Sequence, residues 1–144
     1  MMTRLKKSLV AVLPLVAALV SIVPISTPAS AAPGTSCDPG TYGCMRFFYN
    51  SNRAGSYTYF NANVSDLAPY TFLTSGSGQG QGIKNNAASV LNNASTFMTI
   101  YYNSGYAGPC DTVESWTAAD QLHHTYNQNA SFRWNYTRSD CYVF

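Results

Sequence analysis

Four cysteines are the residues of this 144-residue chain whose chemistry depends most on their surroundings. Their thiols can pair as disulfides in an oxidising compartment or, as thiolates, can bind zinc. Six residues separate the first two, Cys37 and Cys44, and no third or fourth ligand lies near them, which is a poor spacing for zinc. Their even number favours two disulfides, for which three pairings exist. Of these we favour Cys37–Cys44, which closes a short turn, and Cys110–Cys141, which ties the C-terminal end to a loop.

Side chains suited to catalysis are scarce in this sequence. The two histidines are the adjacent His123 and His124, and neighbouring side chains diverge on a strand or a helix, so they form a poor metal site. The sequence contains no HExxH, GxSxG or phosphate-loop motif. We therefore expect no catalytic residues and predict that the protein is not an enzyme.

The first 31 residues predict a secretory signal peptide. Three basic residues precede an apolar run over residues 8–23, and Ala29-Ser30-Ala31 has the small-x-small pattern of a cleavage site. The apolar run contains a proline and is shorter than the roughly 20 residues that a transmembrane helix needs. The folded domain is thus expected over residues 32–144, secreted and extracellular, in a compartment that permits disulfides.

The charge of the predicted mature part is close to zero. Residues 32–144 contain five basic and six acidic residues, which gives a net charge of −1. Such a surface lacks the electrostatic footprint of a protein that binds nucleic acid or an anionic membrane. Aromatic residues make up 14% of the chain and charged residues only 10%, which excludes a disordered chain. We expect a soluble monomer.

The sequence repeats itself. Residues 48–55 (FYNSNRAG) recur 53 positions later as residues 101–108 (YYNSGYAG), and NNAAS at 85–89 recurs 42 positions later as NQNAS at 127–131. The offsets differ because a Gly/Ser/Gln loop over residues 74–82 is present only in the first copy. We expect two similar structural units, at about residues 37–95 and 96–144.

The predicted elements are mainly strands. Aromatic and branched residues favour strands at 44–49, 57–60, 96–102 and 132–134, and Asn, Ser and Gly clusters between them favour turns. Helices are expected only at 117–124 and 87–91. Many short strands at short spacing predict an all-β sandwich, in which the two units pack face to face on one core.

The second hairpin has the pattern Tyr101-x4-Tyr106-x-Gly108, which resembles the aromatic-x4-aromatic-x-Gly signature of the βγ-crystallin Greek key. The first copy departs from it, because Arg53 replaces the second aromatic residue. With the CDPGTYGC start and the two Asn-rich stretches, the chain resembles the secreted βγ-crystallin-type peptidase inhibitors related to the Streptomyces metalloproteinase inhibitor. The resemblance implies a two-motif Greek-key sandwich that binds a secreted protease of the metallopeptidase class.

We expect no cofactor, and the same resemblance makes weakly bound calcium the alternative. The crystallin calcium signature, Asn/Asp-Asn/Asp-x-x-Ser/Thr-Ser, matches five of six positions in the first Asn-rich stretch and fewer in the second. The interpretation that we favour is that these side chains cap turns by bonding nearby backbone groups. Neither stretch contains a carboxylate, so a site there would be weak. The candidate ligands are Asn85, Asn86, Ser89, Asn127 and Ser131.

An inhibitor needs a stiff loop that enters a protease cleft, since rigidity lowers the ordering cost of binding. The segment after the second hairpin contains a proline and a cysteine, which would stiffen it. We predict that it contacts the protease; the alternative is an ordinary hairpin connection. Its candidate residues are Tyr106, Gly108, Pro109, Cys110, Asp111, Thr112 and Val113.

Two other functions fit the same fold. One is an extracellular binding or structural module with weak calcium affinity, and the other is an antimicrobial protein of the killer-toxin type. Calcium-dependent melting would distinguish the first, and growth inhibition without any effect on proteases the second.

Overall fold

A computed structural model describes residues 33–34, 36–37 and 43–144. The predicted signal peptide, and residues 38–42 between the first two cysteines, lie outside these ranges. The described residues form eight strands and no helix, which confirms the all-β prediction. The strands are β1 (Cys44–Asn50), β2 (Ala54–Phe60), β3 (Ser89–Asn93), β4 (Met98–Asn103), β5 (Ala107–Val113), β6 (Ala118–Ala119), β7 (Ser131–Trp134) and β8 (Tyr142–Val143).

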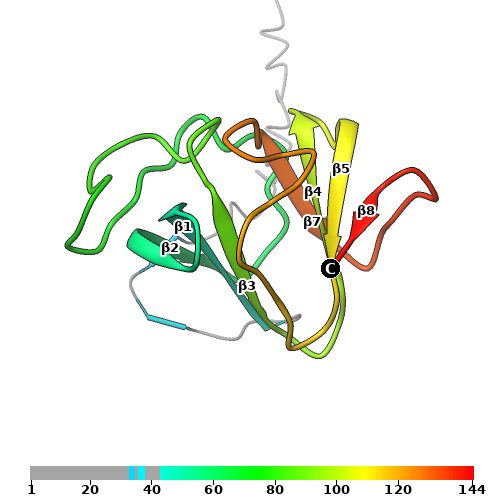
Figure 1. Ribbon diagram of the computed structural model, residues 1–144, viewed down its shortest axis with the longest axis horizontal. Helices are drawn as coiled ribbons and strands as arrows, with labels where there is room; N and C mark the ends of the chain where they lie inside the picture. Colours follow the sequence, from blue (N-terminus) through cyan, green and yellow to red (C-terminus); the bar gives the residue numbers. More distant parts are fainter. Residues whose placement is uncertain (1–32, 35, 38–42) are drawn as a thin grey trace, which may run out of the picture.

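The strands form two four-stranded sheets that face each other (Figure 1). The first sheet has the order β2-β1-β3-β6 and the second has the order β7-β4-β5-β8. Neighbouring strands are antiparallel except β8, which pairs with β5 in parallel. The C-terminal strand therefore protects the edge of β5 that would otherwise be open.

Each half contributes one extended piece to the sheet of the other half. The short strand β6 belongs to the second half but pairs with β3 of the first sheet. In return, Val64 of the first half forms an antiparallel bridge with Phe132 of β7 in the second sheet. The two sheets are consequently built from interleaved parts of both copies.

The strand pairing repeats with the offsets seen in the sequence. Phe48 in β1 lies opposite Ser89 in β3, and Tyr101 in β4 lies opposite Ser131 in β7. Phe48 and Tyr101 are 53 positions apart in the sequence, and Ser89 and Ser131 are 42 positions apart, which are the two offsets of the repeat. The strand register of both hairpins also shifts just before the turn, between Phe48 and Asn50 in the first and between Tyr101 and Asn103 in the second.

A buried serine fastens each hairpin to its sheet. The hydroxyl of Ser89 donates to the carbonyl of Asn50 at 2.6 Å and accepts from the backbone N–H of Arg53 at 3.0 Å. Ser131 makes the same two bonds in the second hairpin, at 2.7 and 3.0 Å. Both serines are fully buried, so their hydroxyls are satisfied within the protein.

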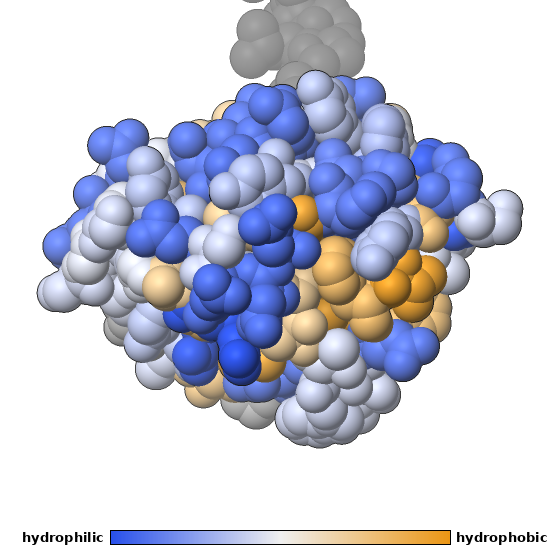
Figure 2. Space-filling view, in the orientation of Figure 1, coloured by the Kyte–Doolittle hydropathy of each residue, from blue (hydrophilic) through white to orange (hydrophobic). Residues whose placement is uncertain are grey.

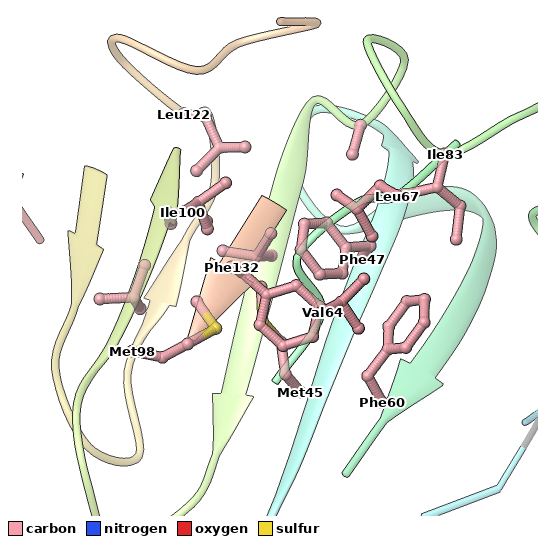
Figure 3. Close-up of a cluster of buried hydrophobic side chains, with 14 of the residues drawn as sticks. Met45, Phe47, Phe60, Val64, Leu67, Ile83, Met98, Ile100, Leu122 and Phe132 are labelled. Atoms are coloured by element: carbon pink, nitrogen blue, oxygen red, sulfur yellow. The ribbon is translucent and has the colours of Figure 1, made fainter. Parts of the chain in front are cut away.

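The core fills the space between the two sheets, and Figure 3 shows its centre. The rings of Phe47, Phe60 and Phe132 lie 5.1 to 5.7 Å apart, centroid to centroid, and join β1 and β2 to β7. Such tilted and edge-on contacts are favourable geometries for aromatic pairs. One core thus serves both halves.

The strands at 44–49, 57–60, 96–102 and 132–134 are confirmed within a few residues at their ends. The two predicted helices are wrong, because their backbone N–H groups bond outside their own segments. The N–H of Ala88 donates to Phe48, and the N–H of Leu122 donates to Ala88. Among the described residues, none lies in a helix that could span a membrane.

The loop over residues 74–82, at the left of Figure 1, is fastened to the first hairpin. The N–H of Ser56 donates to the carbonyl of Ser77, and the hydroxyl of Ser56 donates to the carbonyl of Thr74. Gly78 lies so close to the Tyr49 ring that a Cβ there would be 2.1 Å from a ring carbon. The loop therefore packs on the sheet although its composition is that of a flexible linker.

We predict that Ser131→Ala and Ser89→Ala each lower the free energy of unfolding by roughly 1–3 kcal/mol, because each removes a buried hydroxyl that bonds one backbone N–H and one backbone C=O of its hairpin. Urea denaturation followed by circular dichroism measures the change. The exposed Ser75→Ala is the control and should stay within about 0.5 kcal/mol of wild type. Equal effects at all three positions would contradict the role of the buried serines.

Candidate functional site

The second hairpin has the packing that its aromatic pattern predicts. The rings of Tyr101 and Tyr106 lie 5.9 Å apart in an edge-on arrangement, and partial burial raises the pKa of the Tyr106 phenol. Gly108 has φ of 82°, and a Cβ there would lie 2.8 Å from the Asn103 side-chain nitrogen. Glycine is therefore required where the chain turns back.

The first hairpin replaces this aromatic contact with an ion pair. Nε of Arg53 lies 2.8 Å from a carboxylate oxygen of Asp120, which comes from the second half of the chain. Both side chains are about half exposed, so this ion pair contributes little stability. It links the first hairpin to the segment after β6.

The predicted protease-binding segment divides into an exposed and a buried part. Gly108 and Pro109 are partly or fully exposed, next to the half-buried Tyr106. The remaining predicted residues lie in β5 and are buried: Cys110, Asp111, Thr112 and Val113. Residues 107–113 thus form a strand where the sequence predicted a loop, because they pair with β4 on one side and, at their end, with β8 on the other.

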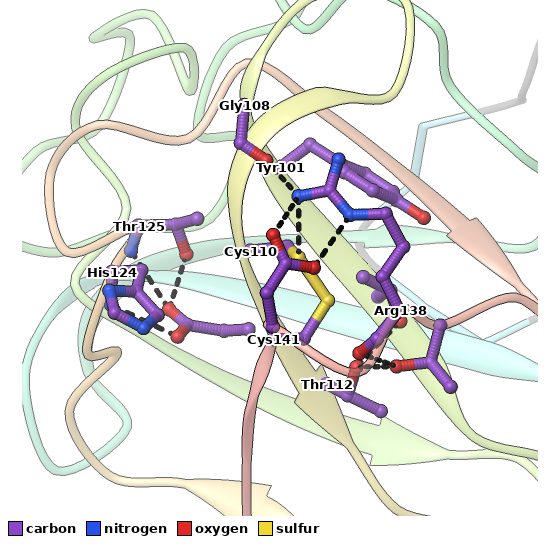
Figure 4. Close-up of a disulfide and its surroundings, with 12 residues drawn as sticks. Tyr101, Gly108, Cys110, Thr112, His124, Thr125, Arg138 and Cys141 are labelled. Carbon is purple, nitrogen blue, oxygen red and sulfur yellow. Dashed lines mark hydrogen bonds and ion pairs between the residues drawn. A yellow bond between two sulfur atoms is a disulfide. The ribbon is translucent and has the colours of Figure 1, made fainter.

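Both disulfides have the favoured pairing, Cys37–Cys44 and Cys110–Cys141 (Figure 4 shows the second). The guanidinium of Arg138 lies over the second disulfide, donates to the carbonyl of Gly108 and forms an ion pair with Asp140 at 3.0 Å. The C-terminal segment is therefore held against β5 by a covalent bond and by a charged side chain.

Asp111 is a buried acid that organises a loop. It has no solvent exposure, and its carboxylate accepts hydrogen bonds from the backbone N–H groups of His123, His124 and Thr125 at 2.9 to 3.1 Å. The Thr125 hydroxyl donates a fourth bond at 2.7 Å. Four donors compensate the loss of hydration of a buried carboxylate.

This loop brings the two histidine rings into contact. The ring centroids of His123 and His124 are 4.5 Å apart, and His123 stacks on Tyr142 of β8 at 4.3 Å with an interplanar angle of 15°. The prediction that adjacent histidines diverge is wrong here, because the pair lies in a loop and not in a strand or helix. Both side chains are exposed, so they form a surface aromatic cluster with Tyr142.

A second buried polar side chain fastens the turn that follows β5. The Asn92 amide is fully buried and donates to the carbonyls of Thr96, Val113 and Glu114 at 2.8 to 3.2 Å. Its oxygen accepts from the N–H of Ala94 at 3.1 Å. One side chain thus holds the loop before β4 and the turn after β5 together.

A hollow of about 470 Å³ opens beside this turn. Six of its eight lining residues are polar or charged, and the apolar ones are Phe97 and Val143. Figure 2 shows apolar residues gathered on the face that carries β8 and the C-terminal end. Neither this hollow nor Asn92 could be predicted from the sequence, because a single asparagine between strands gives no local pattern. The lining residues are Ser95, Thr96, Phe97, Thr112, Glu114, Ser115, Thr137 and Val143.

Residues 30–113, which make up more than half of the chain, match the family model of peptidase inhibitor family I36. The chain belongs to this family. The resemblance found from the sequence is thereby confirmed, and this I36 protein is a peptidase-inhibitor-like protein. No curated protein sequence matches the chain.

Solved structures similar to this I36 protein have the βγ-crystallin fold. One was solved in work on the evolution of the eye lens βγ-crystallin domain fold; it has a TM-score of 0.58 and 17% identity, covering 76% of this chain and all of that chain. Spherulin 3a from Physarum polycephalum has a TM-score of 0.52 and 19% identity, with coverages of 76% and 98%. A βγ-crystallin from Ciona intestinalis has a TM-score of 0.52 and 14% identity, with coverages of 65% and 100%. The predicted Greek-key fold is confirmed.

The two Asn-rich stretches lie side by side. The N–H of Asn85 donates to the carbonyl of Asn129 at 2.8 Å, and the N–H of Asn127 donates to Ala87 at 3.0 Å. Asn86 and Asn127 both line a polar hollow of about 240 Å³. The Ser89 and Ser131 hydroxyls are instead committed to the hairpins, so a calcium site would depend on the three predicted amide side chains, Asn85, Asn86 and Asn127. Calcium binding stays a prediction.

We predict that Asp111→Asn lowers the free energy of unfolding by roughly 2–4 kcal/mol, because the amide places two donors among four existing donors in a buried position. Amide hydrogen exchange should accelerate at residues 123–125, and urea denaturation measures the loss in the free energy of unfolding. The exposed Asp120→Asn is the matched control and should cost less than about 1 kcal/mol. Unchanged exchange at residues 123–125 would show that the carboxylate does not hold the loop.

We predict that calcium binds no more tightly than about 1 mM, because the candidate ligands are neutral amides. At about 10 mM calcium the melting temperature should then rise by only a few degrees. Isothermal titration calorimetry provides the affinity, and a variant with Asn85→Ala and Asn127→Ala should lose the heat of binding. Micromolar binding would contradict a site made of neutral amides. Binding that the double variant retains would show that calcium binds at another site.

Proposed function

We propose that this protein is a secreted inhibitor of peptidases, and that metallopeptidases are its target class. Membership in family I36 is the observation that carries the proposal. The predicted signal peptide and the pairing of all four cysteines support a role outside the cell. The metallopeptidase class comes from the resemblance to the Streptomyces metalloproteinase inhibitor.

The fold suits an inhibitor because it fixes its loops before binding. The second disulfide ties the C-terminal segment to β5, and the amide of Asn92 ties the turn after β5 to the loop before β4. A surface that is already ordered loses little conformational entropy when it meets a partner. Such preorganisation favours tight binding through one exposed loop.

The titratable side chains are poorly arranged for catalysis. Within the described residues, one cluster of three potential metal ligands occurs, formed by Cys110, Asp140 and Cys141. Its two cysteines are bonded to each other, which removes both thiolates. The carboxylate of Asp111 is buried and occupied by four donors of the loop over residues 123–125. These features support an inhibitor and not an enzyme.

Two exposed segments of the second half fit the proposed mechanism, in which a rigid loop occupies the peptidase cleft. One is the hairpin that carries Tyr106, Gly108 and Pro109, supported from behind by the second disulfide. The other is the turn Glu114–Thr117, supported by Asn92. The two segments lie at opposite ends of β5, so they are alternative candidates for the segment that enters the cleft.

We predict that purified residues 32–144 inhibit a thermolysin-like metallopeptidase at a molar ratio near one, measured by cleavage of a fluorogenic peptide. Protein whose disulfides have been reduced and alkylated should inhibit far less, because its loops are no longer held. Serine, cysteine and aspartic peptidases form the comparison panel. Inhibition of one of these classes alone would correct the target class, and unchanged activity of all four would overturn the proposed function.

A further inference from the structure

The turn between β5 and β6 carries a highly exposed aromatic side chain. Trp116 is 69% exposed, more than any other large hydrophobic side chain among the described residues. The turn is closed by a hydrogen bond from the N–H of Thr117 to the carbonyl of Glu114 at 3.3 Å. An exposed tryptophan adds nothing to the core, and tryptophan is enriched among residues that dominate binding to partners.

The backbone of Trp116 is in an unfavourable conformation. Its φ is 60°, in the left-handed region that bulky residues rarely adopt. Asparagine tolerates this region better, and glycine adopts it without cost. Trp116 occupies the third position of a four-residue turn, where such a φ usually selects glycine or asparagine.

The duplication explains most other left-handed residues but not this one. Asn52 and Arg53 of the first hairpin correspond to Gly105 and Tyr106 of the second, and Asn85 corresponds to Asn127. With the offset of 53 that relates the two hairpins, Trp116 corresponds to Asn63, which is not among the residues with positive φ. Its conformation is therefore a local feature of this turn and not a product of the shared fold. Unfavourable backbone conformations of this kind concentrate at functional sites.

The base of the turn is held rigidly. The N–H of Trp116 donates to the carbonyl of Ala94 at 3.2 Å, and the N–H of Glu114 donates to Phe144 at 3.3 Å. The buried Asn92 amide bonds the carbonyl of Glu114 at 3.0 Å. The turn is thus joined to β3, to the loop before β4 and to the C-terminal residue, while the tryptophan ring projects from it.

The surroundings of Trp116 form a surface that another protein could cover. The hollow of about 470 Å³ is lined by Ser115, the neighbour of Trp116, and by Phe97 and the 55% exposed Val143. Glu114 is the only charged residue in its lining. A projecting aromatic side chain beside a hollow with a single charged lining residue suits a partner that has a deep apolar pocket with an uncharged rim.

We propose that the turn Glu114–Thr117 is the segment that enters the peptidase cleft, and that Trp116 fills the apolar pocket which normally binds a large substrate side chain. This inference rests on the inhibitory function proposed above. Because the turn is closed by a hydrogen bond, its backbone is not extended like a substrate, so it blocks the cleft without being cut. The family match ends at residue 113, so the assignment rests on the structure of this chain.

Substitution at position 116 separates binding from stability. Trp116→Ala and Trp116→Gly should each weaken inhibition of the thermolysin-like peptidase by at least about tenfold, because they remove the side chain that fills the pocket. Trp116→Gly should also melt at or above the wild-type temperature, because glycine adopts the left-handed conformation without strain. A tryptophan kept for stability would instead give a lower melting temperature with unchanged inhibition.

Two further variants serve as controls on exposed hydrophobic residues. Leu73→Ala changes a 37% exposed side chain of the first half, and Tyr102→Ala changes a 39% exposed side chain beside the rival hairpin. Both should inhibit like wild type. A loss at Tyr102 with none at Trp116 would move the contact to the hairpin and overturn the proposal.

Fluorescence supplies a readout that does not depend on activity. The other tryptophan, Trp134, is only 3% exposed, so a blue shift on binding the peptidase reports Trp116. The shift should vanish in Trp116→Phe. Inhibition by wild type without any shift, or equal inhibition by the Trp116 variants, overturns this assignment and leaves the inhibitory function standing. Failure of wild type against every peptidase overturns both.

Discussion

The structure depends on a reciprocal exchange between its two halves. The second half gives β6 to the first sheet, and the first half gives Val64 to the second sheet. Neither sheet is complete without the other copy, and the rings of Phe47, Phe60 and Phe132 fill the space that the exchange encloses. A short domain of this size buries enough apolar surface only if both repeats share a core.

The exchange fixes the scaffold, and a few buried polar groups then fix the loops. The hydroxyls of Ser89 and Ser131 fold the hairpins back onto the sheets, Asp111 collects four donors from the loop over residues 123–125, and Asn92 joins two loop bases. Each group is buried and hydrogen-bonded, so removing it would leave several partners unsatisfied. The surface loops are therefore held by the interior, which is the property that an inhibitor of a peptidase needs.

The repeat and the core strands could be predicted, because aromatic clusters and matched offsets are visible along the chain. The cysteines predicted two disulfides but allowed three pairings, of which the favoured one is found. Strand β5 could not be predicted, since Ala107, Gly108, Pro109 and Asp111 all have low strand propensity and only pairing with β4 extends them. The same holds for the candidate site. No local pattern shows that a tryptophan will occupy a left-handed turn, or that an asparagine 24 residues earlier will hold the base of that turn.

The interleaving of the sheets also constrains how such a chain could have arisen. A single ancestral repeat would lack the extended piece that its partner now supplies, and its core face would be open to water. Two identical copies could complete each other around a twofold axis, as in a homodimer with exchanged segments. In one chain the two copies need not stay identical, and here the first carries a glycine-rich loop and the second a projecting tryptophan.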